Sequence, residues 1–243
     1  MGALSATGQP AKRAPFAPLV PGVRFVAPND VAALRAAVDD GVGLILLEPI
    51  LGEGGVIPLD HALVEAAAEL EPLLCFDEVQ TGIGRTGTCF AFEQLGVRPD
   101  LVTLAKGLAN GLPIGALLVA DGASGALVPG DHGSTFGGNP VSCAAAQAVL
   151  DTVDGPLLEN VRERGAQLAA GLEDFAGVVS VRGRGLLLGV VVDGKAADAV
   201  DAARAEGLLV LTAGDDVVRL APPLTVTAGE ADEALAVLSR IFC

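Results

Sequence analysis

Short apolar runs separated by turn residues recur through the first half of the chain. The runs 73–76 (LLCF) and 101–105 (LVTLA) have no helical spacing and are bounded by turns, which predicts two buried strands. The run 44–49 (LILLEP) predicts a third strand. Apolar positions near a 3.6-residue period predict helices over 31–40 and 59–71. These elements indicate an α/β protein with a mostly parallel sheet.

The pattern changes near Asp154, where we place a boundary between a first domain, 1–154, and a small α/β domain, 155–243. Before the boundary, a helix is predicted to begin near Pro140. After it, the pattern predicts strands over 178–183, 185–193, 208–212 and 216–224, and helices over 157–175, 195–207 and 228–242. At the other end of the chain, the prolines of residues 1–30 predict an extended arm without a helix.

The composition of the chain indicates which kinds of binding partner to expect. The 243 residues carry 15 Lys and Arg against 30 Asp and Glu, a formal charge of −15, which argues against a nucleic-acid or anionic-membrane partner. No apolar run approaches the roughly 20 residues of a membrane span. The four cysteines lack metal-type spacing, and His61 and His132 are isolated, so no metal site is expected. These features favour a reduced, cytoplasmic compartment.

Two charged residues follow directly on the two central runs. Asp77 follows 73–76 and Lys106 follows 101–105. Because strand carboxyl ends in an open parallel sheet face the ligand crevice, both side chains should reach one edge of one sheet. A lysine beside low-dielectric walls has a lowered pKa, so its amine can add to a carbonyl such as the aldehyde of pyridoxal phosphate. From the residues alone, the alternative that Asp77 caps a helix and Lys106 is a solvated strand-end charge stays open.

Four motifs in a fixed order resolve that choice. They are LLEPILGEGG (46–55), FDEVQTGIGRTG (76–87), LAKGLANGLPIGA (104–116) and HGSTFGGNPVSCAAA (132–146). Together they resemble the class III pyridoxal-phosphate aminotransferases, and within that family they are most similar to the acetylornithine aminotransferases. The resemblance implies the fold of type I pyridoxal-phosphate transferases, with a partial large domain and a small C-terminal α/β domain.

The resemblance implies a role for each matching residue near the cofactor. Lys106 would hold pyridoxal phosphate and move the proton, and Asp77 would keep its ring nitrogen protonated. Gln80 would hydrogen-bond the phenolic oxygen of the cofactor. Thr135, with Ser134 beside it, would bind the cofactor phosphate of a neighbouring subunit, which implies a homodimer with shared active sites.

The resemblance also implies the substrates. Arg219 would bind a substrate carboxylate and pair with Glu53, which swings aside to admit substrates. Arg184 is a second candidate carboxylate clamp, although a turn role suits it better. The implied reaction transfers an amino group between N-acetylornithine, or an ornithine-like amine, and 2-oxoglutarate, a step of arginine biosynthesis.

The likeness covers roughly the last three-fifths of a family subunit. The glycine-rich phosphate cup and the ring-stacking aromatic residue of the family have no counterpart in these motifs. In addition, Leu51 stands where a glutamine is expected, and the helix before Asp77 is about one turn short. Two alternatives therefore stay open: a non-catalytic, truncated remnant, and a related ornithine or γ-aminobutyrate aminotransferase.

Overall fold

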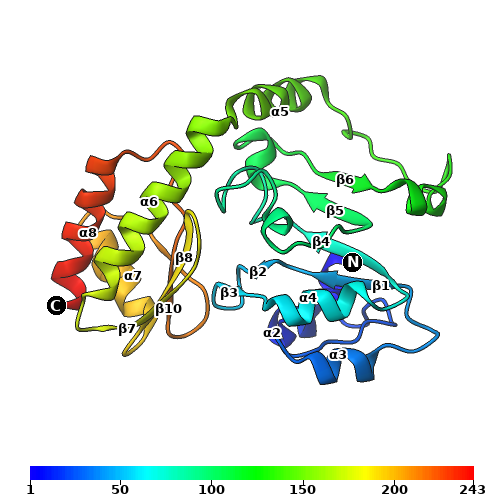
Figure 1. Ribbon diagram of the computed structural model, residues 1–243, viewed down its shortest axis with the longest axis horizontal. Coiled ribbons are helices and arrows are strands. Elements are labelled where there is room, and N and C mark those ends of the chain that lie inside the picture. The colour runs from blue at the N-terminus through cyan, green and yellow to red at the C-terminus, as the bar shows by residue number, and fades with distance from the viewer.

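The first half of the chain is built around a four-stranded sheet. The computed structural model describes residues 1–243 apart from the side chain of Ala126. The sheet has the order β1-β4-β5-β6, with β1 at Leu44–Leu47, β4 at Leu73–Asp77, β5 at Leu101–Leu104 and β6 at Ala116–Val119. The pairs β1–β4 and β4–β5 are parallel, and β6 runs antiparallel to β5 (Figure 1). The predicted α/β class and the two central strands are confirmed.

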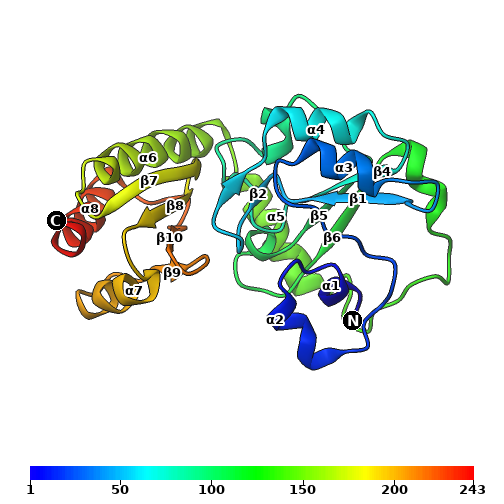
Figure 2. The same ribbon diagram turned by 90° about the horizontal axis from the view of Figure 1, so that it is seen from below.

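Apolar side chains of this sheet are buried beneath two helices. Leu74 and Phe76 of β4 pack in one cluster with Leu63 and Val64 of α4 (His61–Ala68). Helix α3 (Val31–Ala37) adds Leu34 to the same cluster. Figure 2 shows α3 and α4 on one side of the sheet and the N-terminal segment on the other. Helical segments therefore lie on both faces of the sheet (Figure 2).

The prediction of an arm without helices is wrong for the first residues. The structure forms short helices at α1 (Gly2–Ser5), α2 (Pro10–Arg13) and η1 (Ala14–Phe16). Pro10 occupies the first turn of α2, where a missing N–H costs nothing because that group has no helical partner. Residues 17–30 contain no helix or strand, as expected.

Both helices predicted before Asp77 are shorter than expected. Helix α3 ends at Ala37, three residues early, because Asp39 closes a local turn on the Gly41 N–H at 3.0 Å and pairs with Arg24 at 2.8 Å. Helix α4 begins only at His61, since the Leu59 N–H is bound to the Pro49 carbonyl at 3.0 Å. Hydrogen bonds to groups outside the helix thus replace helical ones at the end of α3 and the start of α4.

Connecting elements complete this half. A small hairpin joins β2 (Ile50–Leu51) to β3 (Ile57–Pro58). Three 3-10 helices follow, η2 (Ala91–Gln94), η3 (Lys106–Ala109) and η4 (Asp121–Ala126). Helix α5 (Pro140–Thr152) begins at the predicted Pro140, and the side chain of Asn139 caps it by accepting from the Val141 N–H at 2.9 Å.

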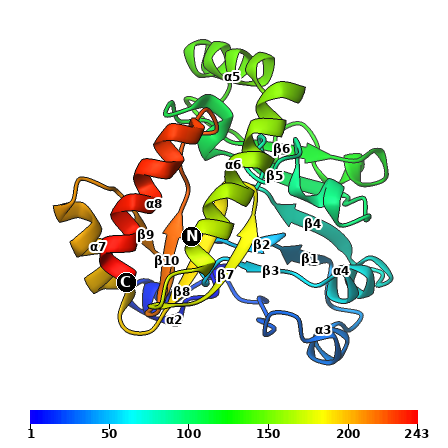
Figure 3. The same cartoon turned by 60° about the vertical axis from the view of Figure 1, so that its left-hand side comes forward.

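The second half forms a separate antiparallel sheet of order β7-β8-β10-β9. Its strands are β7 (Val178–Arg184), β8 (Leu187–Val192), β9 (Leu211–Thr212) and β10 (Val217–Leu220). Helices α6 (Gly155–Glu173), α7 (Ala196–Ala205) and α8 (Ala228–Phe242) share one apolar cluster with this sheet. Figure 3 shows α6 and α8 beside it. Strand β9 is shorter than predicted, because the Leu208 N–H closes the end of α7 on Ala203.

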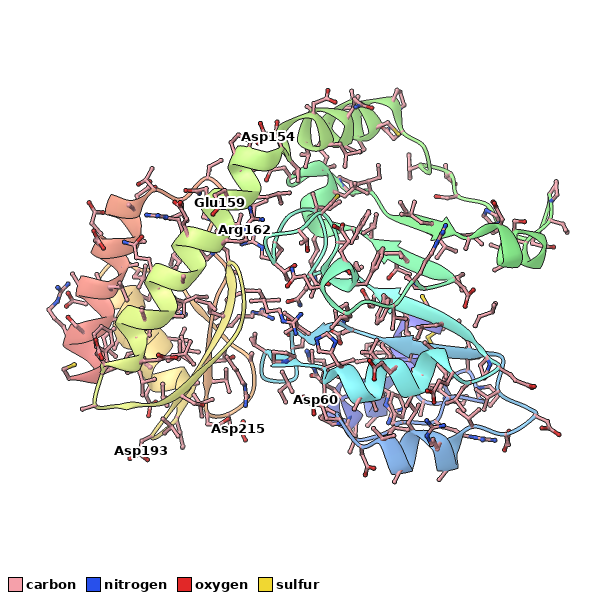
Figure 4. All side chains as sticks on the ribbon, in the orientation of Figure 1. Asp60, Asp154, Glu159, Arg162, Asp193 and Asp215 are labelled. Atoms are coloured by element: carbon pink, nitrogen blue, oxygen red, sulfur yellow. The ribbon has the colours of Figure 1, made fainter. Side chains whose placement is uncertain are left out.

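Arginines donate to backbone carbonyls across the junction between the two sheets. Arg162 of α6, labelled in Figure 4, reaches the Gly87 carbonyl at 2.5 Å, and Arg182 of β7 reaches the Gly55 carbonyl at 2.6 Å. In the other direction, Arg85 donates to the carbonyls of Leu186 and Pro222 at 3.1 and 2.5 Å. Burial lowers the pKa of Arg85 to about 10. These contacts hold the second sheet against the carboxyl edge of the first.

No helix among the described residues has both the length and the apolar character needed to cross a membrane. The division into two domains at Asp154 stays a prediction. In the structure, the side chain of Asp154 caps α6 by accepting a hydrogen bond from the Leu157 N–H at 2.9 Å.

Candidate active site

Carboxylates stand at the ends of two adjacent parallel strands. The register pairs Leu47 of β1 with Phe76 of β4, so Glu48 and Asp77 follow at the same level of the sheet. Asp77 is in turn the register partner of Thr103 on β5. Its Oδ1 accepts from the Val79 N–H at 3.0 Å, which fixes the chain as it leaves the strand. The parallel sheet therefore delivers these carboxylates to one edge, as the sequence predicts for Asp77.

Lys106 leaves β5 in an unusual backbone conformation. It is the first residue of η3 and has φ 43°, in the left-handed region that non-glycine residues seldom occupy. The residue is exposed, yet partial burial of its amine lowers its pKa, while the negative charges of Glu53 and Asp77 act to raise it. A lowered pKa increases the neutral, nucleophilic fraction of the amine. Lys106 is thus suited to covalent chemistry with a carbonyl.

A hydrogen-bonded triad forms beside these groups. Arg219 of β10 donates from Nη1 to Glu53 Oε1 at 2.6 Å and to Gln80 Oε1 at 3.3 Å. Gln80 Nε2 donates to the same Glu53 oxygen at 3.0 Å. Hydrogen bonding to Arg219 lowers the pKa of Glu53. Three residues that lie far apart in the sequence are therefore brought together where the two sheets meet.

Glu48 is part of this edge, although no motif in the sequence marked it as a site residue. Its Oε2 accepts from the Gly52 N–H at 3.0 Å, and it is half-buried. Burial raises the pKa of Glu48, and the nearby charge of Asp77 adds to that effect. The signal that could have found it is its position directly after an apolar strand that neighbours the Asp77 strand.

The structure places the other predicted residues elsewhere. Ser134 and Thr135 lie on an exposed segment before α5, where Ser134 Oγ accepts from the Gly137 N–H at 3.0 Å. Within the described part of the chain, neither hydroxyl forms a hydrogen bond with Asp77 or Lys106. Arg184 is the last residue of β7 and pairs in register with Leu187.

A cavity of about 720 Å³ extends along β1 beneath residues 22–28. Glu48, Leu51 and Asp77 line the end of it that lies at the carboxyl edge. Lys106 does not line this cavity. The charges of Asp77, Glu53 and Arg219 nevertheless all act on the pKa of the Lys106 amine, so these groups lie near one another at the edge.

Relatives with assigned names match the whole chain. An acetylornithine aminotransferase of Gloeobacter violaceus is 51% identical, and the match covers 100% of this chain and 63% of that protein. An acetylornithine aminotransferase of Mycolicibacterium smegmatis is 49% identical over 100% of this chain and 64% of its own length. The chain thus spans less than two thirds of the length of these relatives.

Solved structures with the same fold include two aminotransferases. The ornithine aminotransferase of Toxoplasma gondii matches with a TM-score of 0.92 and 34% identity, over 99% of this chain and 61% of that one. The N-acetylornithine aminotransferase of Stenotrophomonas maltophilia matches with a TM-score of 0.82 and 38% identity, over 90% and 61%. The family model described as aminotransferase class-III matches residues 1–242. The chain therefore belongs to the class III aminotransferase family.

Proposed function

We propose that this chain carries the lysine-bearing part of a pyridoxal-phosphate-dependent aminotransferase. The substrates would be N-acetylornithine, or an ornithine-like amine, and 2-oxoglutarate, as in arginine biosynthesis. The observation that carries the proposal is the placement of Asp77 and Lys106 at the ends of the neighbouring parallel strands β4 and β5, where the carboxylate acts on the amine. The names of the relatives at 51% and 49% identity support the choice of substrates.

The residues at the sheet edge suit the cofactor. Pyridoxal phosphate, when bound, supplies an aldehyde that combines with amines and a ring that accepts electrons. The Lys106 amine would hold the aldehyde carbon and then act as base and acid, moving a proton to and from the substrate carbon. Asp77, as a carboxylate, would keep a proton on the ring nitrogen. Gln80 would donate to the phenolic oxygen.

Arg219 and Glu53 would select the substrate carboxylate. The guanidinium of Arg219 suits a carboxylate because it offers parallel N–H donors, and Glu53 occupies that position here. A dicarboxylate substrate would displace Glu53, whereas a substrate with a neutral or cationic end would leave the pair closed. One site could in this way accept both members of a transamination pair.

Ser134 and Thr135 would act in a second copy of the chain. Their segment is exposed, and Phe136 within it is 81% exposed. A hydroxyl and backbone N–H groups before a helix suit an anion such as a phosphate. We therefore propose a homodimer in the cytoplasm, in which this segment closes the site of the partner subunit.

The solved structures with this fold also include an enzyme named for a related reaction. The ornithine aminotransferase of Toxoplasma gondii matches this fold at a TM-score of 0.92, against 0.82 for the N-acetylornithine enzyme of Stenotrophomonas maltophilia. Ornithine or γ-aminobutyrate transamination is thus the second candidate. A non-catalytic remnant is the third, because the helix before Asp77 is short, at His61–Ala68.

A substrate panel separates these candidates. The purified chain would be mixed with pyridoxal phosphate, dialysed and titrated in parallel with N-acetylornithine, ornithine and γ-aminobutyrate while its visible absorbance is followed. The proposal predicts that a bound chromophore responds most strongly to N-acetylornithine, and that the Lys106→Ala variant does not respond. A chain that binds the cofactor but responds best to ornithine supports the second candidate, and one that retains no chromophore supports the remnant.

A further inference from the structure

Gly52 lies at the centre of the contacts that hold Glu53 on Arg219. Its N–H donates to Glu48 Oε2 at 3.0 Å, and its carbonyl accepts from Arg219 Nη1 at 3.0 Å. A Cβ placed on Gly52 would overlap Gln80 Oε1, so the turn passes directly against that amide. The position of Gly52 thus determines where its neighbour Glu53 can reach.

Among these contacts, only the hydrogen bond between the Gly52 N–H and Glu48 ties the turn to the end of a strand of the first sheet. Glu48 follows β1, whose register with β4 is fixed by four paired residues. The other partners of Gly52 are the side chains of Arg219 and Gln80, which themselves contact Glu53. When Glu53 moves, these two contacts change with it, whereas the Glu48 contact does not involve Glu53.

We propose that Glu48 is a positioning residue, which anchors the 48–52 turn through the Gly52 N–H and so holds Glu53 in reach of Arg219. The role belongs to the site proposed above. A hydrogen bond from a backbone N–H to a carboxylate is among the stronger ones in proteins, because the acceptor is charged. Its loss would free the turn while leaving both sheets intact.

Hydrogen exchange at single-residue resolution tests the anchor in the full chain without cofactor. In Glu48→Ala, the Gly52 amide should exchange at least about tenfold faster than in the wild type. Glu48→Gln keeps an acceptor oxygen of the same reach but loses the charge, so its Gly52 amide should exchange faster than in the wild type and clearly slower than in Glu48→Ala. Glu48→Asp keeps the charge but is too short to reach, so it should behave like Glu48→Ala.

Chemical modification tests the consequence for Arg219. The Arg219 side chain is 10% exposed and its Nη1 is bound to Glu53. Phenylglyoxal should therefore modify Arg219 faster in Glu48→Ala and Glu48→Asp than in the wild type or Glu48→Gln, as read by mass spectrometry. A general loosening would expose the other arginines equally, whereas the anchor predicts a selective change at Arg219.

Asp39→Ala is the matched control, because Asp39 also accepts from a glycine N–H in a turn, that of Gly41 at 3.0 Å. It should accelerate exchange at Gly41 and leave exchange at Gly52 and modification of Arg219 unchanged.

If Glu48→Ala loses amide protection throughout both sheets, that variant has unfolded, and the test then depends on the Gly52 exchange rate of Glu48→Asp. The proposal is overturned if Glu48→Asp retains wild-type protection at Gly52, or if Glu48→Gln exchanges as fast as Glu48→Ala. Neither measurement needs cofactor or substrate, so the outcome is independent of whether the chain transfers an amino group.

Discussion

Arg219 and Glu53 are joined by a hydrogen bond of 2.6 Å although 166 residues separate them in the sequence. Arg219 belongs to the second sheet, and Glu53 belongs to the turn between β2 and β3 beside the first. The pair thus spans the junction of the two halves of the chain. A change at either residue alters both the proposed carboxylate site and the contact between the sheets.

Replacing Glu53 by Gln should produce a pH-dependent loss of stability. Arg219 lowers the pKa of Glu53 below its ordinary 4.5, so the ionised side chain stabilises the fold above that pH. This contribution is lost as pH falls through the lowered pKa of the folded state. Because Glu53 is 46% exposed, solvent screening limits the effect to about 1 kcal/mol or less at neutral pH.

Urea unfolding at several pH values measures this difference. The gap in free energy of unfolding between wild type and Glu53→Gln should narrow as the solution becomes acidic. Glu233→Gln, an exposed substitution on α8, is the control and should show no such trend. A gap that stays constant from neutral pH to below the lowered pKa would contradict the pairing.

Lys106 should react with an acylating reagent at lower pH than an ordinary lysine. Burial lowers its pKa from the ordinary 10.5, which raises the neutral fraction of its amine at a given pH. Mass spectrometry can follow labelling of Lys106 against pH, with a lysine-containing peptide as reference. A midpoint at or above that of the peptide would show that the amine is not desolvated.

Asp77→Asn should shift this labelling curve further down. The Asp77 carboxylate raises the pKa of Lys106, so its neutralisation removes a stabilising field from the ammonium. Asp60→Asn is the matched control, because Asp60 is exposed and precedes α4 (Figure 4). Equal curves for Asp77→Asn and the wild type would place the two groups too far apart to share a cofactor.

Phe76→Ala should destabilise the first sheet by about 3–5 kcal/mol, since it removes a large side chain from a packed core. Phe76 has 0% exposure and stacks on Phe92 at a centroid distance of 6.1 Å. Phe136→Ala removes the same group from a position that is 81% exposed, so it should change stability by less than about 0.5 kcal/mol. Chemical denaturation of both variants checks the contrast, and comparable losses would contradict the packing of β4.

The local pattern of apolar residues was enough to predict the strand that carries Asp77. The run 73–76 is apolar and bounded by turns, and the structure buries Leu74, Cys75 and Phe76 there. Helix boundaries were predicted less well because side-chain hydrogen bonds, such as that from the Gly41 N–H to the Asp39 carboxylate, compete with helical ones. The short helix that begins at Pro10 was not predicted, because proline was taken to exclude a helix although it is allowed in the first turn.

The site depends on contacts that no local pattern contains. The pairing of Glu53 with Arg219 followed only from the family resemblance, because nothing in either segment specifies the other. Glu48 was missed because its raised pKa arises from burial between β1 and the arm, which depends on strand register and cavity shape. Exposed Ser134 and Thr135 show a further limit, since their proposed role requires a second copy of the chain.

The most direct measurement of the central claim is the position at which pyridoxal phosphate attaches. The chain contains three lysines, Lys12, Lys106 and Lys195, so borohydride reduction followed by peptide mass spectrometry can assign the adduct without ambiguity. Our account predicts a reduced adduct on Lys106 that is absent from Lys106→Ala, whereas Lys195→Ala retains it. An adduct distributed equally among the three lysines, or concentrated on Lys12 or Lys195, would contradict it.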